Sequence, residues 1–242
     1  MQGRTADDQP DPTGHPILGR AARIEDRVQE WRERLARRRG RATVVVPYAG
    51  YGRPGWVRVL GRVLLTNEDL TDPDRVVRGW RSFTAVPVND VLVVVTIEGV
   101  EHRVRADRGG IVDVRLEAPF GPGRHTVRLR AEDPQARSTS EEVEADVFVI
   151  DVSAGFGIVS DIDDTVMVTA LPRPFLAAWN SFVIDEHART PTPGMAVLYD
   201  RLQAAHPETP VLYLSTGAWN TAPTLGRFLG RNLYPTGPML LT

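Results

Sequence analysis

The residues best suited to carry chemistry are carboxylates in one short segment. Residues 161–165 read Asp-Ile-Asp-Asp-Thr and directly follow an apolar run over 156–160. Open α/β sheets bind their ligands at the carboxyl ends of such strands. Two carboxylates separated by one residue can point into the same pocket there. The first, Asp161, can attack phosphorus as a nucleophile. The second, Asp163, can protonate the leaving alkoxide and then deprotonate a water molecule.

A phosphoryl group beside two carboxylates requires a cation to offset the repulsion. Asp161 and Asp163 are therefore the expected ligands of a Mg²⁺ ion, together with a backbone carbonyl. Three other interpretations remain open for the motif alone. It could be a solvated acidic loop or a chance match. It could also be a calcium loop, although the glycine and distal glutamate of an EF-hand are absent at the required offsets.

A second apolar run, Val211–Leu214, ends at a Ser-Thr-Gly sequence. If this run is the strand next to the nucleophile strand, the Ser215 hydroxyl can donate a hydrogen bond to a phosphoryl oxygen. The alternative is that this hydroxyl caps the helix that follows. The segment between the two runs leaves room for a crossover helix and for a small lid over 166–193 that excludes water.

These residues need a parallel sheet to bring them together. After residue 151 the pattern reads as alternating strands and helices, which is the signature of a parallel sheet with crossover helices. The expected strands are 156–160, 211–214 and 239–241, and the expected helices are 195–205 and 222–231.

The preceding region, 42–151, is rich in valine and has short alternating segments separated by Gly, Pro and Asp turns. This pattern predicts an antiparallel β-sandwich-like domain. Its glycine-rich stretch over 50–55 lacks the lysine of a phosphate-binding loop, and no helix is indicated after it. We expect a turn between two strands at that position.

The first 15 residues are polar and predict a disordered tail. Residues 16–41 predict an amphipathic helix, with its acidic residues early and its arginines late, as the helix dipole favours. The helix could pack on its own protein, or it could lie in a membrane interface with its arginines near anionic head groups. Its apolar side chains recur at spacings of four and three: Ile17, Ala21, Ile24, Val28, Trp31 and Leu35.

Composition narrows the function classes. The net charge of −2 gives no reason to expect a nucleic-acid partner, and the absence of cysteine excludes disulfides and thiolate metal sites. All basic residues other than histidine are arginine, so any cationic catalytic role falls to Arg or His. No signal peptide or spanning segment is evident. We expect a cytoplasmic protein with peripheral membrane contact.

Two motifs resemble those of one family. Ser160–Thr165 and the sequence Tyr-Leu-Ser-Thr-Gly-Ala-Trp-Asn over 213–220 are similar to the phosphatidate phosphatase family related to the yeast actin-patch-associated enzyme, within the haloacid dehalogenase superfamily. Residues 216–218 depart from the Ser-Asn-Ser-Pro-Trp-Asn form of relatives. The resemblance implies Mg²⁺-dependent hydrolysis of an anionic lipid phosphomonoester through an aspartyl-phosphate. The residues it implicates are Asp161 as nucleophile, Asp163 as acid/base, Ser215 and Thr216 as phosphate ligands, and Trp219 and Asn220 as substrate contacts.

The expected architecture combines α/β with all-β structure: an N-terminal helix, the sandwich, and a partial haloacid dehalogenase-like domain over 152–242. No Asp or Glu follows Glu208, so the acidic strand end that completes the metal site in this family is not expected within the chain. A C-terminally truncated domain with little or no phosphatase activity is the expectation. The alternatives are a non-catalytic module that binds anionic lipid and a phosphatase that acts on soluble phosphoesters.

Overall fold

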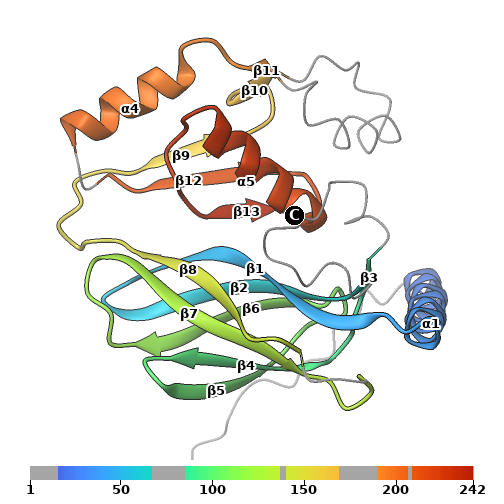
Figure 1. The fold of residues 1–242 in the computed structure, drawn as a ribbon. Helices are drawn as coiled ribbons and strands as arrows, with labels where there is room; N and C mark the ends of the chain where they lie inside the picture. Colours follow the sequence, from blue (N-terminus) through green and yellow to red (C-terminus); the bar gives the residue numbers. More distant parts are fainter. Residues whose placement is uncertain (1–15, 67–84, 137–139, 169–189, 207–208, 242) are drawn as a thin grey trace, which may run out of the picture.

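The chain passes from a long helix into a strand-rich region and then into alternating strands and helices (Figure 1). The computed structural model describes residues 16–66, 85–136, 140–168, 190–206 and 209–241. The expected tail over 1–15 lies outside the described residues.

The strand-rich region forms one eight-stranded sheet that curls on itself. Its strands run in the order β3-β2-β1-β8-β7-β4-β5, and β6 pairs with β2 (Figure 1). The strands are β1 (Ala42–Arg53), β2 (Gly55–Thr66), β3 (Val86–Pro87), β4 (Leu92–Ile97), β5 (Val100–Arg105), β6 (Ile111–Ala118), β7 (Gly123–Glu132) and β8 (Val143–Val149).

The expectation of an antiparallel sandwich holds for most strand pairs but not for all of them. β1 and β8 pair in parallel, with Gly50 opposite Val147 and Gly52 opposite Val149. The sheet is therefore mixed, and its strands stay hydrogen-bonded in one path instead of forming two separate sheets. β8 pairs antiparallel with β7 on one side and parallel with β1 on the other. Most of the curled sheet separates β1 from β8 in the sequence.

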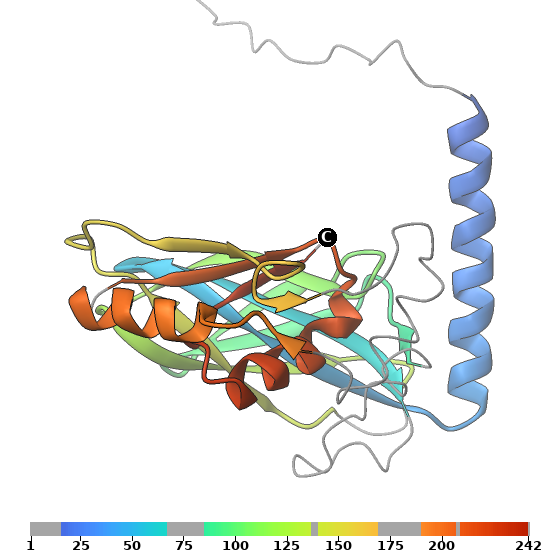
Figure 2. The same cartoon turned by 90° about the horizontal axis from the view of Figure 1, so that it is seen from above.

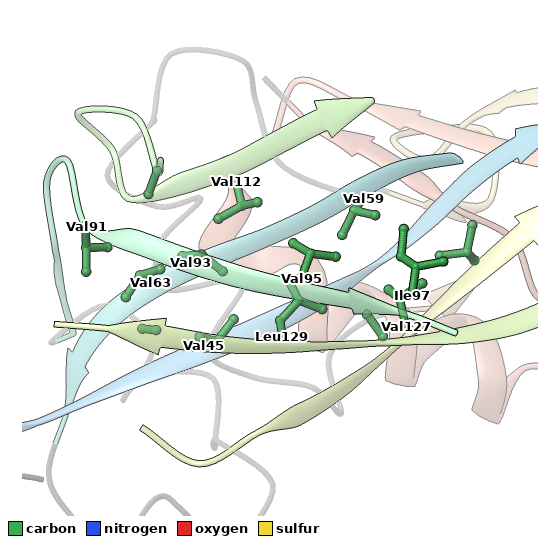
Figure 3. Packing of buried hydrophobic residues seen from close by; sticks show 14 of the residues in the cluster. Val45, Val59, Val63, Val91, Val93, Val95, Ile97, Val112, Val127 and Leu129 are labelled. Carbon is green, nitrogen blue, oxygen red and sulfur yellow. The ribbon is translucent and has the colours of Figure 1, made fainter. Parts of the chain in front are cut away.

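The concave side of the curled sheet encloses a core of valine, leucine and isoleucine side chains (Figure 3). Alternate residues of β2 point into it, so Val57, Val59 and Val63 are fully buried. Burial of one such side chain stabilises the fold by about 1.5 kcal/mol. Because alternate residues of a strand face this core, apolar side chains recur at every second position of the sequence.

The glycine-rich stretch is a hairpin, as expected. β1 ends at Arg53 and β2 begins at Gly55, with Gly52 paired to Val57 and Arg53 paired to Trp56. A Cβ on Gly50 would meet the backbone oxygen of Arg58, so the close approach of the two strands requires glycine there.

The C-terminal region contains a three-stranded parallel sheet in the order β13-β12-β9. A helix lies between successive strands in the sequence, which matches the alternation expected there. The elements are β9 (Ile158–Asp161), α4 (Met195–Ala205), β12 (Val211–Ser215), the 3₁₀ turn η2 (Trp219–Thr221), α5 (Ala222–Arg231) and β13 (Met239–Leu241). The short strands β10 (Met167–Val168) and β11 (Thr190–Pro191) pair antiparallel beside them.

A second core joins the two sheets. It contains Tyr48 and Leu60 from the curled sheet together with residues of β12, α4 and α5. Tyr48 stacks on Trp219 with ring centroids 4.9 Å apart, and its hydroxyl donates to the Trp219 carbonyl over 3.1 Å. The three-stranded sheet is thus packed on the outer side of the curled sheet (Figure 1).

The N-terminal helix α1 (Pro16–Arg38) stands at one side of the molecule (Figure 2). Its carboxyl-terminal half is fixed by polar contacts to the curled sheet. Gln29 donates to the Pro87 carbonyl over 3.1 Å, and Arg37 forms an ion pair of 2.7 Å with Asp133. Among the described helices, none is both long and apolar enough to cross a bilayer.

Candidate active site at the carboxyl ends of β9 and β12

The two candidate strand ends lie side by side. β9 and β12 pair in parallel, with Asp161 opposite Leu214, and the N–H of Ile162 donates to the Leu214 carbonyl over 3.0 Å. Ser215 is the next residue of β12. The expectation that the acidic motif and the hydroxyl occupy neighbouring strand ends is confirmed.

A tight turn holds the acidic motif. The N–H groups of Val166 and Met167 both donate to the Ile162 carbonyl, over 3.1 and 3.0 Å. Asp164 has a positive φ of 59°, and its N–H donates to the Met167 carbonyl over 2.8 Å. Aspartate tolerates this left-handed conformation better than most residues. Because Ile162 is fully buried, the turn is anchored in the core between the two acids.

Ser215 connects the two strand ends through its hydroxyl. The hydroxyl donates to Asp163 Oδ2 over 2.9 Å and accepts from the N–H of Gly217 over 3.0 Å. Ser215 is 5% exposed, so both bonds are shielded from bulk water. A serine hydroxyl has one proton. In this arrangement that proton orients Asp163, and it must be redirected if Ser215 is to contact a phosphoryl group.

The candidate nucleophile is open to solvent. Asp161 is exposed and Asp163 is half-buried, whereas the intervening Ile162 is buried. Thr216, the second expected phosphate ligand, is also exposed, at the end of β12. The side chains of Asp161 and Thr216 are therefore open to a ligand from solvent, whereas the Ser215 hydroxyl is shielded.

The two expected substrate contacts have other surroundings. Trp219 is half-buried and stacked on Tyr48, which places it in the joint between the two sheets. Asn220 is half-buried, and its Oδ1 has no hydrogen-bond partner among the described residues. A contact of either residue with substrate stays a prediction.

Three tyrosines support the site, and sequence reasoning missed them. The Tyr199 hydroxyl lies 2.6 Å from Ser160 Oγ, beside the nucleophile. Tyr234 donates to the Val166 carbonyl over 2.8 Å, within the acidic turn, and Tyr213 donates to the Pro235 carbonyl over 2.8 Å. Burial raises the pKa of the Tyr213 and Tyr234 hydroxyls above the ordinary value, which keeps them protonated as donors. In the sequence they differ in no way from ordinary apolar positions.

The donor set at this edge consists of oxygen atoms. Carboxylates of Asp161 and Asp163 are hard ligands, and Mg²⁺ commonly takes one or two carboxylates and completes its shell with water and substrate phosphate. The described residues contain no group of three or more His, Asp or Glu side chains that could hold a metal ion. The oxygen atoms of Asp161 and Asp163 are of the type that Mg²⁺ prefers, and a Mg²⁺ ion at this edge stays a prediction.

The expected lid over 166–193 is described only at its ends. Met167 pairs with Pro191 and Val168 with Thr190, so the two ends meet beside the acidic turn. The segment between them lies outside the described residues.

Comparison with known proteins gives one family match. Residues 156–242 match the family model described as "Phosphatidate phosphatase APP1, catalytic domain". The resemblance expected from the two motifs is thus confirmed for this part of the chain. No curated protein matches the chain.

Two solved structures show a weak likeness. One is "a bacterial immunoglobulin-like domain from the M. primoryensis ice-binding adhesin", with 12% identity, 46% of this chain and 96% of that chain covered, and a TM-score of 0.23. The other is described as "Ca2+-stabilized adhesin helps an Antarctic bacterium reach out and bind ice". Its identity is 14%, with 50% of this chain and 28% of that chain covered, and its TM-score is 0.25.

Proposed function

We propose that the edge formed by β9 and β12 is the active site of a Mg²⁺-dependent phosphatidate phosphatase of the haloacid dehalogenase type. One observation carries the proposal: Asp163, two residues after the exposed Asp161, is hydrogen-bonded to Ser215 across two adjacent parallel strand ends. The match of residues 156–242 to a phosphatidate phosphatase catalytic domain supports the substrate class.

In the first half-reaction, a carboxylate oxygen of Asp161 attacks the phosphorus of the lipid phosphomonoester. The bond between phosphorus and the lipid oxygen breaks, and an aspartyl-phosphate forms. Asp163 gives its proton to the departing alkoxide, which leaves as diacylglycerol. Because Ser215 donates to Oδ2 of Asp163, the proton to be delivered belongs on Oδ1.

In the second half-reaction, Asp163 takes a proton from a water molecule that attacks the same phosphorus. The bond between phosphorus and Asp161 breaks, inorganic phosphate leaves, and the Asp161 carboxylate is restored. Asp163 regains its proton, so the two steps balance. Exposure of Asp161 allows the water to reach the intermediate.

The remaining residues bind and orient the substrate. Thr216 and, after rotation of its hydroxyl, Ser215 donate to phosphoryl oxygens, and Asn220 offers an amide beside them. A Mg²⁺ ion, held by the Asp161 carboxylate and by Asp163 through its backbone carbonyl, would neutralise the phosphate charge as the nucleophile approaches. A lipid substrate is consistent with the expected peripheral contact with a membrane.

The test is release of inorganic phosphate under single-turnover conditions, with protein in excess over substrate. Because few protein groups are expected to hold the ion, slow turnover is expected. We therefore compare phosphatidate in detergent micelles with glycerol 3-phosphate, each with Mg²⁺ and with EDTA. The proposal expects release from phosphatidate that EDTA abolishes and that glycerol 3-phosphate does not match.

Equal release of phosphate from both substrates would show that the protein is a phosphatase for soluble phosphoesters and not for the lipid. If neither substrate releases phosphate and the protein still binds phosphatidate vesicles, the protein is a lipid-binding module and not an enzyme. Either result overturns the proposal.

A further inference from the structure

In the part of helix α1 whose side chains are described, Val28 and Trp31 point away from the protein. Ala36 is 3% exposed and Gln29 donates to the Pro87 carbonyl, so these two residues face the curled sheet. Trp31 is 61% exposed and Val28 is 50% exposed. Successive residues of a helix are about 100° apart, which places Ala36 and Gln29 roughly 140° and 160° from Trp31.

A defined surface results, which we call the outer face of α1. Val28, Trp31 and Leu35 fall within a sector of about 60°, and three arginines lie within about 60° of Trp31 on its other side. The outer face consists of Arg27, Val28, Trp31, Arg34, Leu35 and Arg38. The apolar stripe expected from the sequence continues at positions 17, 21 and 24, whose side chains lie outside those described.

The outer face has an excess of positive charge. Arg34 forms an exposed pair of 2.8 Å with Glu30. No ion pair is found for Arg27 or Arg38 within the described part of the chain. The acid Glu33 is turned toward the body, where it pairs with Arg37 over 2.7 Å. An exposed indole between arginines suits the boundary between acyl chains and anionic head groups.

We propose that the outer face of α1 lies on an anionic lipid bilayer, with Val28 and Trp31 inserted at the level of the head groups. Arg27, Arg34 and Arg38 reach the lipid phosphates from the flank of the helix. Figure 1 shows β9 and β13 pointing toward the side of the molecule on which α1 lies, so the helix and the site edge share one side. The surface is separate from the site and does not depend on turnover.

A second copy of the chain is the competing occupant, because the four-and-three spacing also suits a coiled coil. The charges oppose it. In a parallel pair, Arg27 of one helix would face Arg32 of the other helix. In an antiparallel pair, the row of Arg27 and Arg34 on one helix would face the same row on the other helix. Both arrangements bring like charges together, whereas an anionic membrane attracts all of them.

The absence of cysteine allows a direct test. Val28→Cys and Val100→Cys each introduce a single thiol at a similarly exposed valine, the second on β5 of the curled sheet. Each is labelled with an environment-sensitive fluorophore and mixed with vesicles of phosphatidylcholine, with and without phosphatidylserine. Phosphatidylserine is not a phosphomonoester, so the site does not hydrolyse it. We expect a blue shift only for the label at 28 and only with phosphatidylserine.

Two further variants measure the contributions. Trp31→Ser should lower vesicle partitioning about tenfold. Joint replacement of Arg27, Arg34 and Arg38 by Gln should lower it roughly fivefold for each arginine and remove its salt dependence. The same charge change at Arg103, Arg105 and Arg128, on the curled sheet, is the control and should have a smaller effect. Far-ultraviolet circular dichroism checks that α1 remains helical.

The proposal is overturned if the label at 28 gives no shift, if the label at 100 shifts equally, or if neutral vesicles bind as well as anionic ones. It is also overturned if the free protein sediments as a dimer that Trp31→Ser dissociates, because a second copy then covers the outer face.

Discussion

At the scale of single residues, the position of one proton decides how the site is organised. The Ser215 hydroxyl donates to Asp163 and receives the Gly217 N–H, so it fixes the acid/base group before any substrate is present. Ser215 is thus a positioning residue for Asp163 in the free protein. It becomes a phosphate ligand only if the substrate competes successfully for its proton.

Ser215→Ala should therefore slow phosphate release roughly ten- to hundredfold, in the range seen when a supporting hydrogen bond is removed. It should cost about 1 kcal/mol of unfolding free energy, because the Gly217 N–H loses its acceptor. Single-turnover assays and denaturant unfolding measure the two effects. Ser215→Thr keeps the hydroxyl and should restore most of the rate.

Ser140→Ala is the matched control for this prediction. Ser140 is also a buried serine whose hydroxyl accepts a backbone N–H, that of Ala131 over 2.7 Å, but it lies beside β7 of the curled sheet and not at the candidate site. It should cost similar stability and leave the rate unchanged. Equal rate losses in both variants would show that Ser215 acts through stability alone.

The sequence was sufficient to predict which strand ends carry Asp161, Asp163 and Ser215, because residue types and apolar runs are local signals. It did not predict that Ser215 donates to Asp163, since that depends on the relative height of two strand ends. It also did not predict that Trp219 stacks on Tyr48, a partner 171 residues away. The local spacing of residues in the sequence does not predict contacts of this kind.

At the scale of elements, α1 is held by a charged cluster at its carboxyl-terminal half. Asp133 accepts hydrogen bonds from Arg37 over 2.7 Å and from Thr43 over 2.6 Å. Burial alone would raise the pKa of Asp133, but these hydrogen bonds outweigh it and hold the pKa below its ordinary value. The ionised carboxylate therefore stabilises the docked helix.

Asp133→Asn should lower the unfolding free energy by about 2 kcal/mol at neutral pH, since it removes two hydrogen bonds to a charged group. The folded-state pKa is depressed, so this stabilisation is complete above the unfolded-state value of about 4 and is lost as the pH falls through the folded value. Urea unfolding of both proteins at neutral and acidic pH measures it. A difference that stays constant down to low pH would contradict the assignment.

Periodicity predicted the α1 helix but not the side that faces the protein. The apolar stripe suggested packing on the protein, with a membrane interface as the alternative. The structure places Ala36 and Gln29 against the curled sheet. The docked side was not evident from the sequence because small and polar residues make its contacts.

At the scale of the whole molecule, the two sheets meet through Tyr48. It is buried, stacks on Trp219 and donates to the Trp219 carbonyl. Burial raises the pKa of Tyr48 to about 12, and the charge of Arg62 lowers it to a lesser extent. The hydroxyl must stay protonated for the contact to persist.

Tyr48→Phe should cost about 1 kcal/mol of unfolding free energy at pH 8, because the carbonyl loses its donor. The folded-state pKa lies about two units above the unfolded value of about 10, so the wild-type protein loses stability between about pH 10 and pH 12, by roughly 2.7 kcal/mol in all. The wild-type advantage of about 1 kcal/mol is lost within roughly the first unit of this range, so the order of the two proteins should reverse at about pH 11. Denaturant unfolding across this range tests it, and a variant that stays less stable throughout would contradict the account.

Much of the overall fold followed from pattern alone. The alternating strands, the helices over 195–205 and 222–231 and the parallel order of the last sheet agree with the sequence-based expectation. The parallel pairing of β1 with β8 and the single curled sheet were not expected. Such pairing is set by contacts between segments distant in the chain, which period and turn signals do not specify.

The central claim is that Asp161 forms the covalent bond to phosphorus, and beryllium fluoride tests it most directly. With Mg²⁺ present, this tetrahedral phosphoryl mimic should bind the Asp161 carboxylate and give a protein-bound ¹⁹F resonance. Asp164→Asn, in the same turn, retains a residue that tolerates a positive φ and is the control. The account predicts the resonance in the wild-type protein and in Asp164→Asn and its absence in Asp161→Asn. A resonance that persists in Asp161→Asn, or that is missing from the wild-type protein, would contradict it.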